Sequence, residues 1–157
     1  MQSVLEDAVR SFVKEDHIKN VLAGAWVRLH DEHGQVLRGI RGRMGAASMS
    51  MSDHEIGVDL IEMEPGSAFP LHTHPGDHIL YILEGLGIIK VNEKQHIVRE
   101  GDTVFIPAEH AHGVSTKAGE NTIFRFLAFG HPHKHISAKD RMTIVEKDAP
   151  TQEESGR

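Results

Sequence analysis

Short apolar segments separated by turn residues fill most of the chain. Between residues 25 and 129 these segments are rich in β-branched and aromatic side chains and are bounded by Gly, Pro, Asn or Asp. The segments are AWVRLH, GVDLIEM, HILYIL, GIIKV, HIV, TVFI and TIFRFLAF. Because no helical period interrupts them, the pattern predicts an all-β sandwich or barrel.

Helical periodicity is confined to the N-terminus. Ser3 and Glu6 have capping-box spacing, and apolar residues recur with a helical period up to Val13. We therefore expect a helix over residues 4–14, while the pattern over 16–22 is too brief to distinguish a second turn from a loop. The predicted organisation is an N-terminal helical extension (1–22), one β-barrel domain (23–147) and a polar, disordered tail (148–157).

Composition narrows the function classes. The net charge of −6 argues against a nucleic-acid partner, and no apolar run is long enough for a membrane helix. The N-terminus lacks the basic start and apolar block of a secretory signal, so we expect a cytoplasmic protein. The one basic cluster, RGIRGR at 38–43, contains glycines that favour a solvated loop over a binding face.

Histidines are the unusual feature, with 13 of them in a chain that has no cysteine. His72 and His74 are two apart, so on a strand they leave the same face. A Pro-Gly-Asp break then lets His78 turn back toward them, and IPAEHAH places His110 and His112 just after the strand TVFI. Converging imidazoles form a coordination shell suited to Zn, Fe, Ni or Cu.

These two segments resemble the cupin superfamily, in particular its small, single-domain, metal-binding members with an RmlC-like jelly-roll barrel. The first family motif, Gly-x5-His-x-His-x3 or x4-Glu-x6-Gly, and the second, Gly-x5-Pro-x-Gly-x2-His-x3-Asn, fall within residues 66–116. They are matched by Gly66, His72, His74, His78, Gly85, Gly101, Pro107 and His112. The resemblance implies a double-stranded β-helix with His72, His74, His78 and His112 as ligands of one divalent transition metal.

Three positions depart from the family pattern. His78 stands where the motif has glutamate, Glu109 where it has glycine, and Thr116 where it has asparagine. Only His78 would touch the metal. An all-imidazole shell is neutral, so the ion keeps its full charge toward an anionic ligand, and Fe(II), Ni, Cu or Zn is favoured over Mn.

The resemblance implies an enzyme for a small anionic or enolisable molecule. We expect an Fe(II)-dependent dioxygenase, because similar cupins without the glutamate include iron dioxygenases. The alternatives are a metal-dependent isomerase or lyase for a sugar-like or carboxylate substrate, a non-catalytic small-molecule sensor, and a site that uses its histidines as bases without metal. Glu109 and His110 are the candidate acid-base residues. A glutamate in a turn is usually just solvated, however, and His110 is expected to lie outside the metal shell, to gate the pocket or simply to be exposed.

The tract HPHKH contains His131, His133 and His135. Pro132 disfavours a position inside a sheet, so we expect a solvent-facing tail or a flap over a neighbouring subunit. Segments outside the motif region commonly extend the sheet or exchange between subunits in similar proteins, which predicts a homodimer. The expected partner is a small molecule, with no nucleic acid and no membrane.

Overall fold

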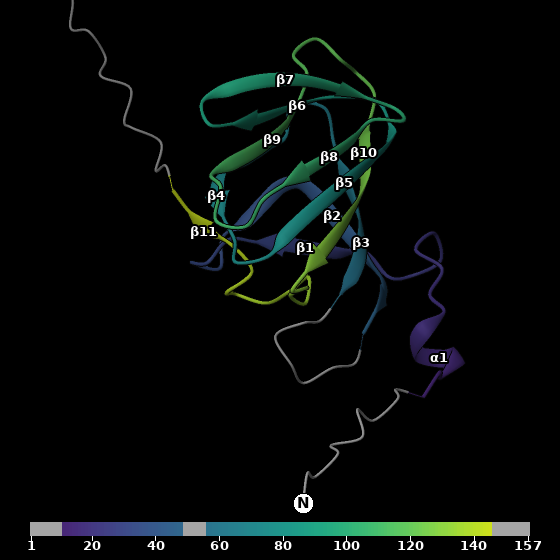
Figure 1. The fold of residues 1–157 in the computed structure, drawn as a ribbon. Helices are drawn as coiled ribbons and strands as arrows, with labels where there is room; N and C mark the ends of the chain where they lie inside the picture. The colour runs from purple at the N-terminus through teal and green to yellow at the C-terminus, as the bar shows by residue number, and fades with distance from the viewer. Residues whose placement is uncertain (1–10, 49–55, 146–157) are drawn as a thin grey trace, which may run out of the picture.

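A computed structural model describes residues 11–48 and 56–145, and these residues form two antiparallel β-sheets (Figure 1). The six-stranded sheet has the order β1-β2-β3-β10-β5-β8, and the five-stranded sheet has the order β11-β4-β9-β6-β7. Strands distant in sequence are neighbours, since β10 lies between β3 and β5. The arrangement is a jelly-roll barrel, which confirms the all-β prediction.

The strand boundaries follow the apolar segments. The six-stranded sheet contains β1 (Val27–His30), β2 (Val36–Ala47), β3 (Gly57–Met63), β5 (Asp77–Glu84), β8 (Thr103–Ile106) and β10 (Phe124–His131). The five-stranded sheet contains β4 (Ala68–Thr73), β6 (Leu86–Val91), β7 (Lys94–Arg99), β9 (His112–Thr116) and β11 (Thr143–Ile144). The predicted apolar segments correspond to β1, β3, β5, β6, β7, β8 and β10.

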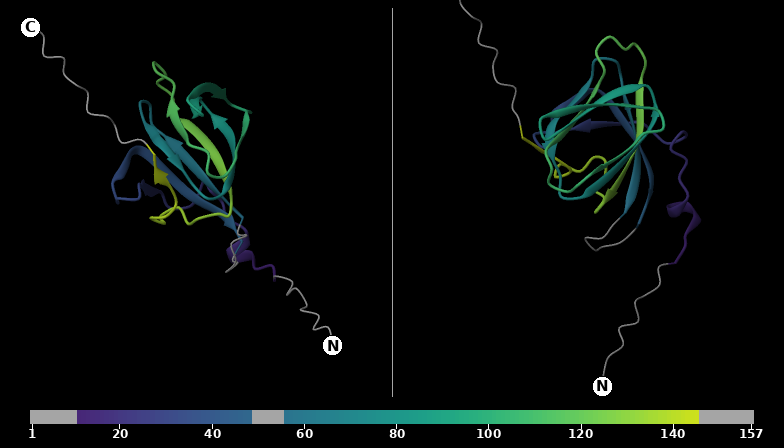
Figure 2. Two further views of the ribbon diagram at one scale, coloured as in Figure 1. Left: turned by 60° about the vertical axis from the view of Figure 1, so that its left-hand side comes forward. Right: turned by 45° about the horizontal axis from the view of Figure 1, so that its top comes forward.

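The core lies between the two sheets, which enclose it when the barrel is viewed with its top forward (Figure 2). Alternate residues of β10, namely Phe124, Phe126 and Ala128, are at most 6% exposed. This period of two is what a strand with one buried face requires. Ile89 and Val114 contribute to the same core from the other sheet. The apolar interior therefore continues along the barrel to the strands that carry the histidines.

The basic segment RGIRGR does not form the predicted solvated loop. It lies in β2, where the guanidinium carbons of Arg41 and Arg43 are 4.0 and 3.9 Å from the centroid of the Trp26 ring. Arg41 and Arg125 both donate hydrogen bonds to Glu62, which is only 2% exposed. A buried carboxylate needs such partners. The basic cluster is therefore explained by contacts within the chain.

The N-terminal part that the structure describes contains one helical turn, α1 (Lys14–His17). The predicted helix over 4–14 falls largely outside the described residues, and of its described portion, residues 11–14, only Lys14 is helical, as the first residue of α1. The predicted tail, 148–157, also lies outside them. No helix in the described ranges is long and apolar enough to cross a membrane.

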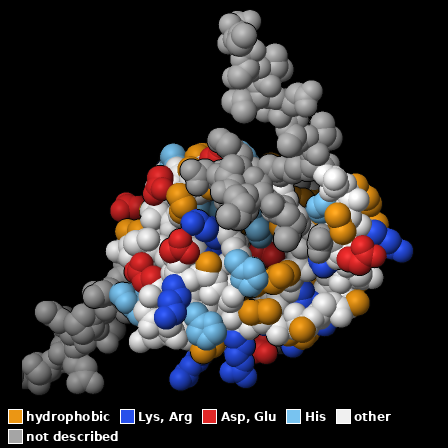
Figure 3. Space-filling model, turned by 90° about the horizontal axis from the view of Figure 1, so that it is seen from below, with side chains coloured by type: hydrophobic (Ala, Val, Ile, Leu, Met, Phe, Trp, Pro, Cys, Tyr) orange, Lys and Arg blue, Asp and Glu red, His pale blue; other side chains and the backbone are white. Residues whose placement is uncertain are grey.

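After β10 the chain turns back across one end of the barrel, and we call residues 132–142 the closing segment. It leads into β11, which pairs with β4 through Thr143 with Thr73 and Ile144 with His72. Met142 is 4% exposed, so the segment is anchored in the core. Several histidine side chains gather at this end (Figure 3). Within the HPHKH tract, His131 and His135 are exposed as predicted, whereas the side chain of His133 is 12% exposed because the pairing of β11 draws the segment inward.

Candidate metal centre

Three histidines from neighbouring strands converge inside the barrel. His72 in β4 and His112 at the start of β9 are paired across the two strands, and His74 follows directly after β4. One ring nitrogen from each of the three lies within 4.8 Å of the others. His72, His112 and His74 are 5%, 3% and 9% exposed. The structure therefore brings together three of the four predicted ligands, which we call the three-histidine group.

A backbone carbonyl orients each of these imidazoles. The Nδ1 contacts are His72 to the Pro70 oxygen at 2.7 Å, His74 to the Gly76 oxygen at 3.1 Å and His112 to the His110 oxygen at 2.8 Å. A carbonyl only accepts, so the proton belongs on Nδ1 and Nε2 keeps a free lone pair. Histidines that bind metals typically donate their second nitrogen in this way.

The Nε2 atoms of His74 and His112 lie 3.0 Å apart. With both protons on Nδ1, neither Nε2 can donate to the other, and two lone pairs facing each other at this distance repel. A shared cation removes the conflict, because two nitrogens about 2.1 Å from one ion and about 90° apart are separated by roughly 3 Å. The donor set therefore fits a transition-metal ion, with His72 as a third ligand.

Burial keeps the imidazoles neutral. Together with a smaller effect of the neighbouring histidines, it lowers the pKa of His72 and of His74 to about 3. It likewise lowers the pKa of His78 to about 4 and lowers that of His112. Neutral imidazole is the form that binds metal. The group is therefore ready to coordinate at neutral pH without losing protons.

His78, the fourth predicted ligand, lies beside the three-histidine group. Its ring centroid is 3.8 Å from that of His74, and its Nδ1 also contacts the Gly76 oxygen at 3.1 Å. Its Nε2 lies against Gly130, where a side-chain Cβ would approach to 3.2 Å. Glycine at position 130 thus leaves room for this ring. The role of His78 as a metal ligand stays a prediction.

A cavity of about 40 Å³ opens beside the histidines. Its polar lining consists of His72, His74, His78, His112 and Arg141. Its apolar lining consists of Ile61, Phe69, Leu80, Ile106, Val114, Phe126, Ala128 and Met142. None of these described lining residues is an aspartate or a glutamate. The arrangement is a small apolar chamber with imidazoles and a single guanidinium as its polar groups.

A family model described as "Cupin domain" matches residues 59–130, which include the three-histidine group. This part of the chain is a cupin domain. This cupin is 29% identical over 93 residues to a germin-like protein from Morus alba, a match that covers 54% of the chain and 44% of that protein. It is 35% identical over 69 residues to an oxalate-binding protein from Thermotoga maritima, covering 43% of the chain and 55% of that protein.

The chain thus spans about half the length of these curated relatives. Among solved structures, a cupin-2 domain from Rhodospirillum rubrum aligns with a TM-score of 0.61 at 19% identity, covering 78% of this chain and 76% of that one. This structural likeness agrees with the jelly-roll fold.

A second polar cluster adjoins the cavity of this cupin. It consists of Asp59 in β3, His133 and Arg141, with His133 Nε2 3.5 Å from an oxygen of Asp59. Burial raises the pKa of Asp59, while His133 and Arg141 oppose that shift. Neither Asp59 nor Arg141 was identified from the sequence. The available signal was the presence of two acids, Asp59 and Glu62, inside the apolar segment GVDLIEM.

The candidate acid-base residues, Glu109 and His110, are both exposed and are not among the residues that line the cavity. Their backbone groups nevertheless support the site. The Glu109 N–H donates to the His74 oxygen at 3.0 Å, and the His110 oxygen accepts from His112. Glu109 has a φ of 64°, the left-handed conformation that suits the glycine of the family motif.

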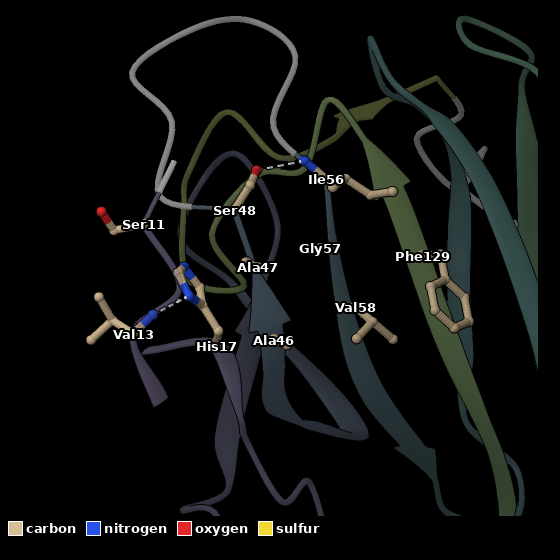
Figure 4. A pocket seen from close by; sticks show the side chains of 10 residues that line it. All are labelled: Ser11, Val13, His17, Ala46, Ala47, Ser48, Ile56, Gly57, Val58 and Phe129. Atoms are coloured by element: carbon tan, nitrogen blue, oxygen red, sulfur yellow. Dashed lines mark hydrogen bonds between the residues drawn. The ribbon is translucent and has the colours of Figure 1, made fainter. Parts of the chain in front are cut away.

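A larger hollow of about 640 Å³ lies beside α1, between the N-terminal segment and the ends of β2, β3 and β10 (Figure 4). Among the described residues that line it, His17 is the one titratable side chain, and its Nδ1 accepts the Val13 N–H at 2.8 Å. The remaining lining is mostly alanine, valine and other apolar residues. The groups suited to metal chemistry are therefore in the smaller cavity.

Proposed function

We propose that this cupin is a metal-dependent enzyme for a small anionic or enolisable acid and that its reaction is an Fe(II)-dependent dioxygenation. The proposal rests on the His74–His112 pair, whose two unprotonated Nε2 atoms lie 3.0 Å apart. When bound, Fe(II) supplies positions at which a substrate and O₂ are held side by side. The neutral imidazoles leave the charge of the ion available to an anionic substrate.

The cavity residues restrict what can react there. A volume of about 40 Å³ corresponds to roughly three water-sized positions, so only a small acid fits. Ile61, Leu80 and Ile106 supply apolar walls that limit the entry of water. Isomerases and lyases need a positioned acid and base to move protons. With the imidazoles bound to the metal, the described lining offers no carboxylic acid for that role, which favours oxygen chemistry over those reactions.

A second candidate function is binding of a small carboxylate without turnover. The relative from Thermotoga maritima that is 35% identical over 69 residues carries the name oxalate-binding protein. The same small cavity suits a ligand of that size, and the described lining offers few groups for proton transfer. The two candidates share the metal and the ligand class, and they differ in whether O₂ is consumed.

Elemental analysis of protein purified without an affinity tag tests the proposal. We expect about one equivalent of iron in the wild type, and a shift toward manganese when His78 is replaced by glutamate, because a carboxylate oxygen suits Mn better than imidazole does. An oxygen electrode then measures O₂ uptake by the Fe(II)-loaded protein with small 2-oxo acids and small diketones, which a cavity of this size admits. Uptake with at least one of them is the expected result.

Two results would count against the proposal in different ways. A wild type that carries zinc or nickel and consumes no O₂ across the panel, even when loaded with Fe(II), would remove the dioxygenase reaction and leave the binding function. A wild type that retains no transition metal and takes none up on dialysis would remove both.

A further inference from the structure

Arg141 is the one cationic side chain among the residues that line the cavity. It lies near the end of the closing segment, and its neighbour Met142 is 4% exposed in the core. Three residues further on, Ile144 pairs with His72. The position of Arg141 relative to the histidines is therefore fixed by strand pairing.

The tip of the Arg141 side chain has an unused donor. The residue as a whole is partly exposed, but its Nη1 is inaccessible to solvent and has no hydrogen-bond partner among the described residues. Buried polar groups are nearly always hydrogen-bonded, and a guanidinium keeps its charge in proteins. A buried cationic donor without a partner, at the wall of a cavity, indicates a position for an anion.

An ion pair with Asp59 does not occupy this N–H donor of Arg141. Asp59 and Arg141 attract each other electrostatically, but the ion pairs formed by the described residues do not include one between them. Asp59 instead lies 3.5 Å from the Nε2 of His133. Asp59 therefore helps to hold a positive charge beside the cavity that Arg141 lines, and it does not pair with Nη1.

We propose that Arg141 is the anion-binding residue of the cavity, with its guanidinium donating to a carboxylate of a two- or three-carbon acid that also reaches the three-histidine group. This inference rests on the proposed function, because it assigns the ligand class of the same site. A planar guanidinium presents its N–H donors in a fork that matches the two oxygens of a carboxylate. The cavity volume of about 40 Å³ sets the size of the acid.

Calorimetric titration tests the assignment without relying on turnover. The full-length protein is loaded with one equivalent of Zn²⁺, which has no redox chemistry, and titrated with glycolate, pyruvate and oxalate. We expect the wild type to bind at least one of them with a Kd below about 1 mM, and to bind pyruvamide, which is uncharged, much more weakly than pyruvate. Arg141→Met should raise the Kd for the carboxylate by about 30-fold or more, which is within the range for loss of a hydrogen bond to a charged group.

Arg43→Met is the matched control. Arg43 also has a buried nitrogen without a hydrogen-bond partner among the described residues, but it lies over the Trp26 ring and not at the cavity. We expect carboxylate affinity within threefold of the wild type in this variant. Metal content is measured for every variant, so that loss of the ion is distinguished from loss of the anion-binding residue.

A carboxylate Kd within threefold of the wild-type value in Zn²⁺-loaded Arg141→Met would overturn the inference. So would a Zn²⁺-loaded wild type that binds none of the three acids, and in that case the metal content still supports the metal site. If Arg141→Met does not fold, Arg141→Lys decides by the same threefold criterion. We expect it to bind about tenfold more weakly, because lysine keeps the charge and loses the planar fork.

Discussion

Replacement of His112 by alanine is expected to weaken metal binding by about 100-fold or more, because even the loss of an outer-sphere partner commonly costs 10- to 100-fold. His112 Nε2 is 3.0 Å from His74 Nε2, so its removal leaves a single imidazole where the pair now faces a common point. His72→Ala is expected to have the same effect, since it removes another of the three nitrogens that lie within 4.8 Å. Competition with a chromogenic chelator measures the affinity.

The control for this prediction is His96→Ala. His96 is an exposed residue of β7, away from the cavity lining, and its loss should leave the metal affinity unchanged. Thermal unfolding of each variant establishes that it is folded. Retention of one tightly bound ion per chain in a folded His112→Ala protein would show that this imidazole is not a ligand.

The metal-free protein is expected to lose stability as the pH falls from 7 to 5. Unfolded histidines take up protons near pH 6.5, whereas in the folded protein the pKa values of His72 and His74 are lowered to about 3 and that of His78 to about 4. At pH values between the folded and the unfolded pKa, the unfolded state binds more protons than the folded state, so acidification favours unfolding. Each histidine contributes about 1.4 kcal/mol per pH unit in this window.

The three histidines together predict a loss of about 5 kcal/mol between pH 6.5 and 5. Asp59 acts in the opposite direction, because its pKa is raised in the folded state and its protonation favours folding. A decrease in Tm of at least about 10 °C therefore remains, at roughly 2–4 °C per kcal/mol for a chain of this size. Scanning calorimetry after chelator treatment measures it.

A folded His72→Leu variant is the comparison for the pH experiment. It lacks one of the three groups, so its pH dependence should be about one third smaller. An unchanged slope in that variant, or an equal Tm at pH 7 and pH 5 in the metal-free wild type, would mean that the buried histidines do not control acid stability.

The fold could be predicted from the sequence wherever a strand had an ordinary apolar pattern. GVDLIEM, TVFI and TIFRFLAF all lie in strands of the six-stranded sheet. RGIRGR could not be predicted correctly, because glycine and arginine are typical of loops. What holds this segment in β2 is an interaction with Glu62, which is 21 residues from Arg41 in the sequence, and local composition does not reveal it.

The site was predictable where its residues follow one another at a fixed spacing. His72, His74 and His112 were identified because two-residue spacing and the two motifs place them together. Arg141 has no such spacing, and it reaches the cavity only because β11 pairs with β4. The position of His133 near Asp59 has the same origin. Contacts made by the closing segment therefore required the structure.

X-ray absorption at the metal K edge tests the central claim most directly, because it identifies the atoms bound to the ion in solution. The geometry predicts three imidazole nitrogens at about 2.0–2.2 Å, with a fourth if His78 binds, and remaining positions filled by oxygen. No sulfur from cysteine is expected, since the chain has none. A shell of oxygen atoms with no imidazole scattering would contradict the assignment of the three-histidine group as a metal centre.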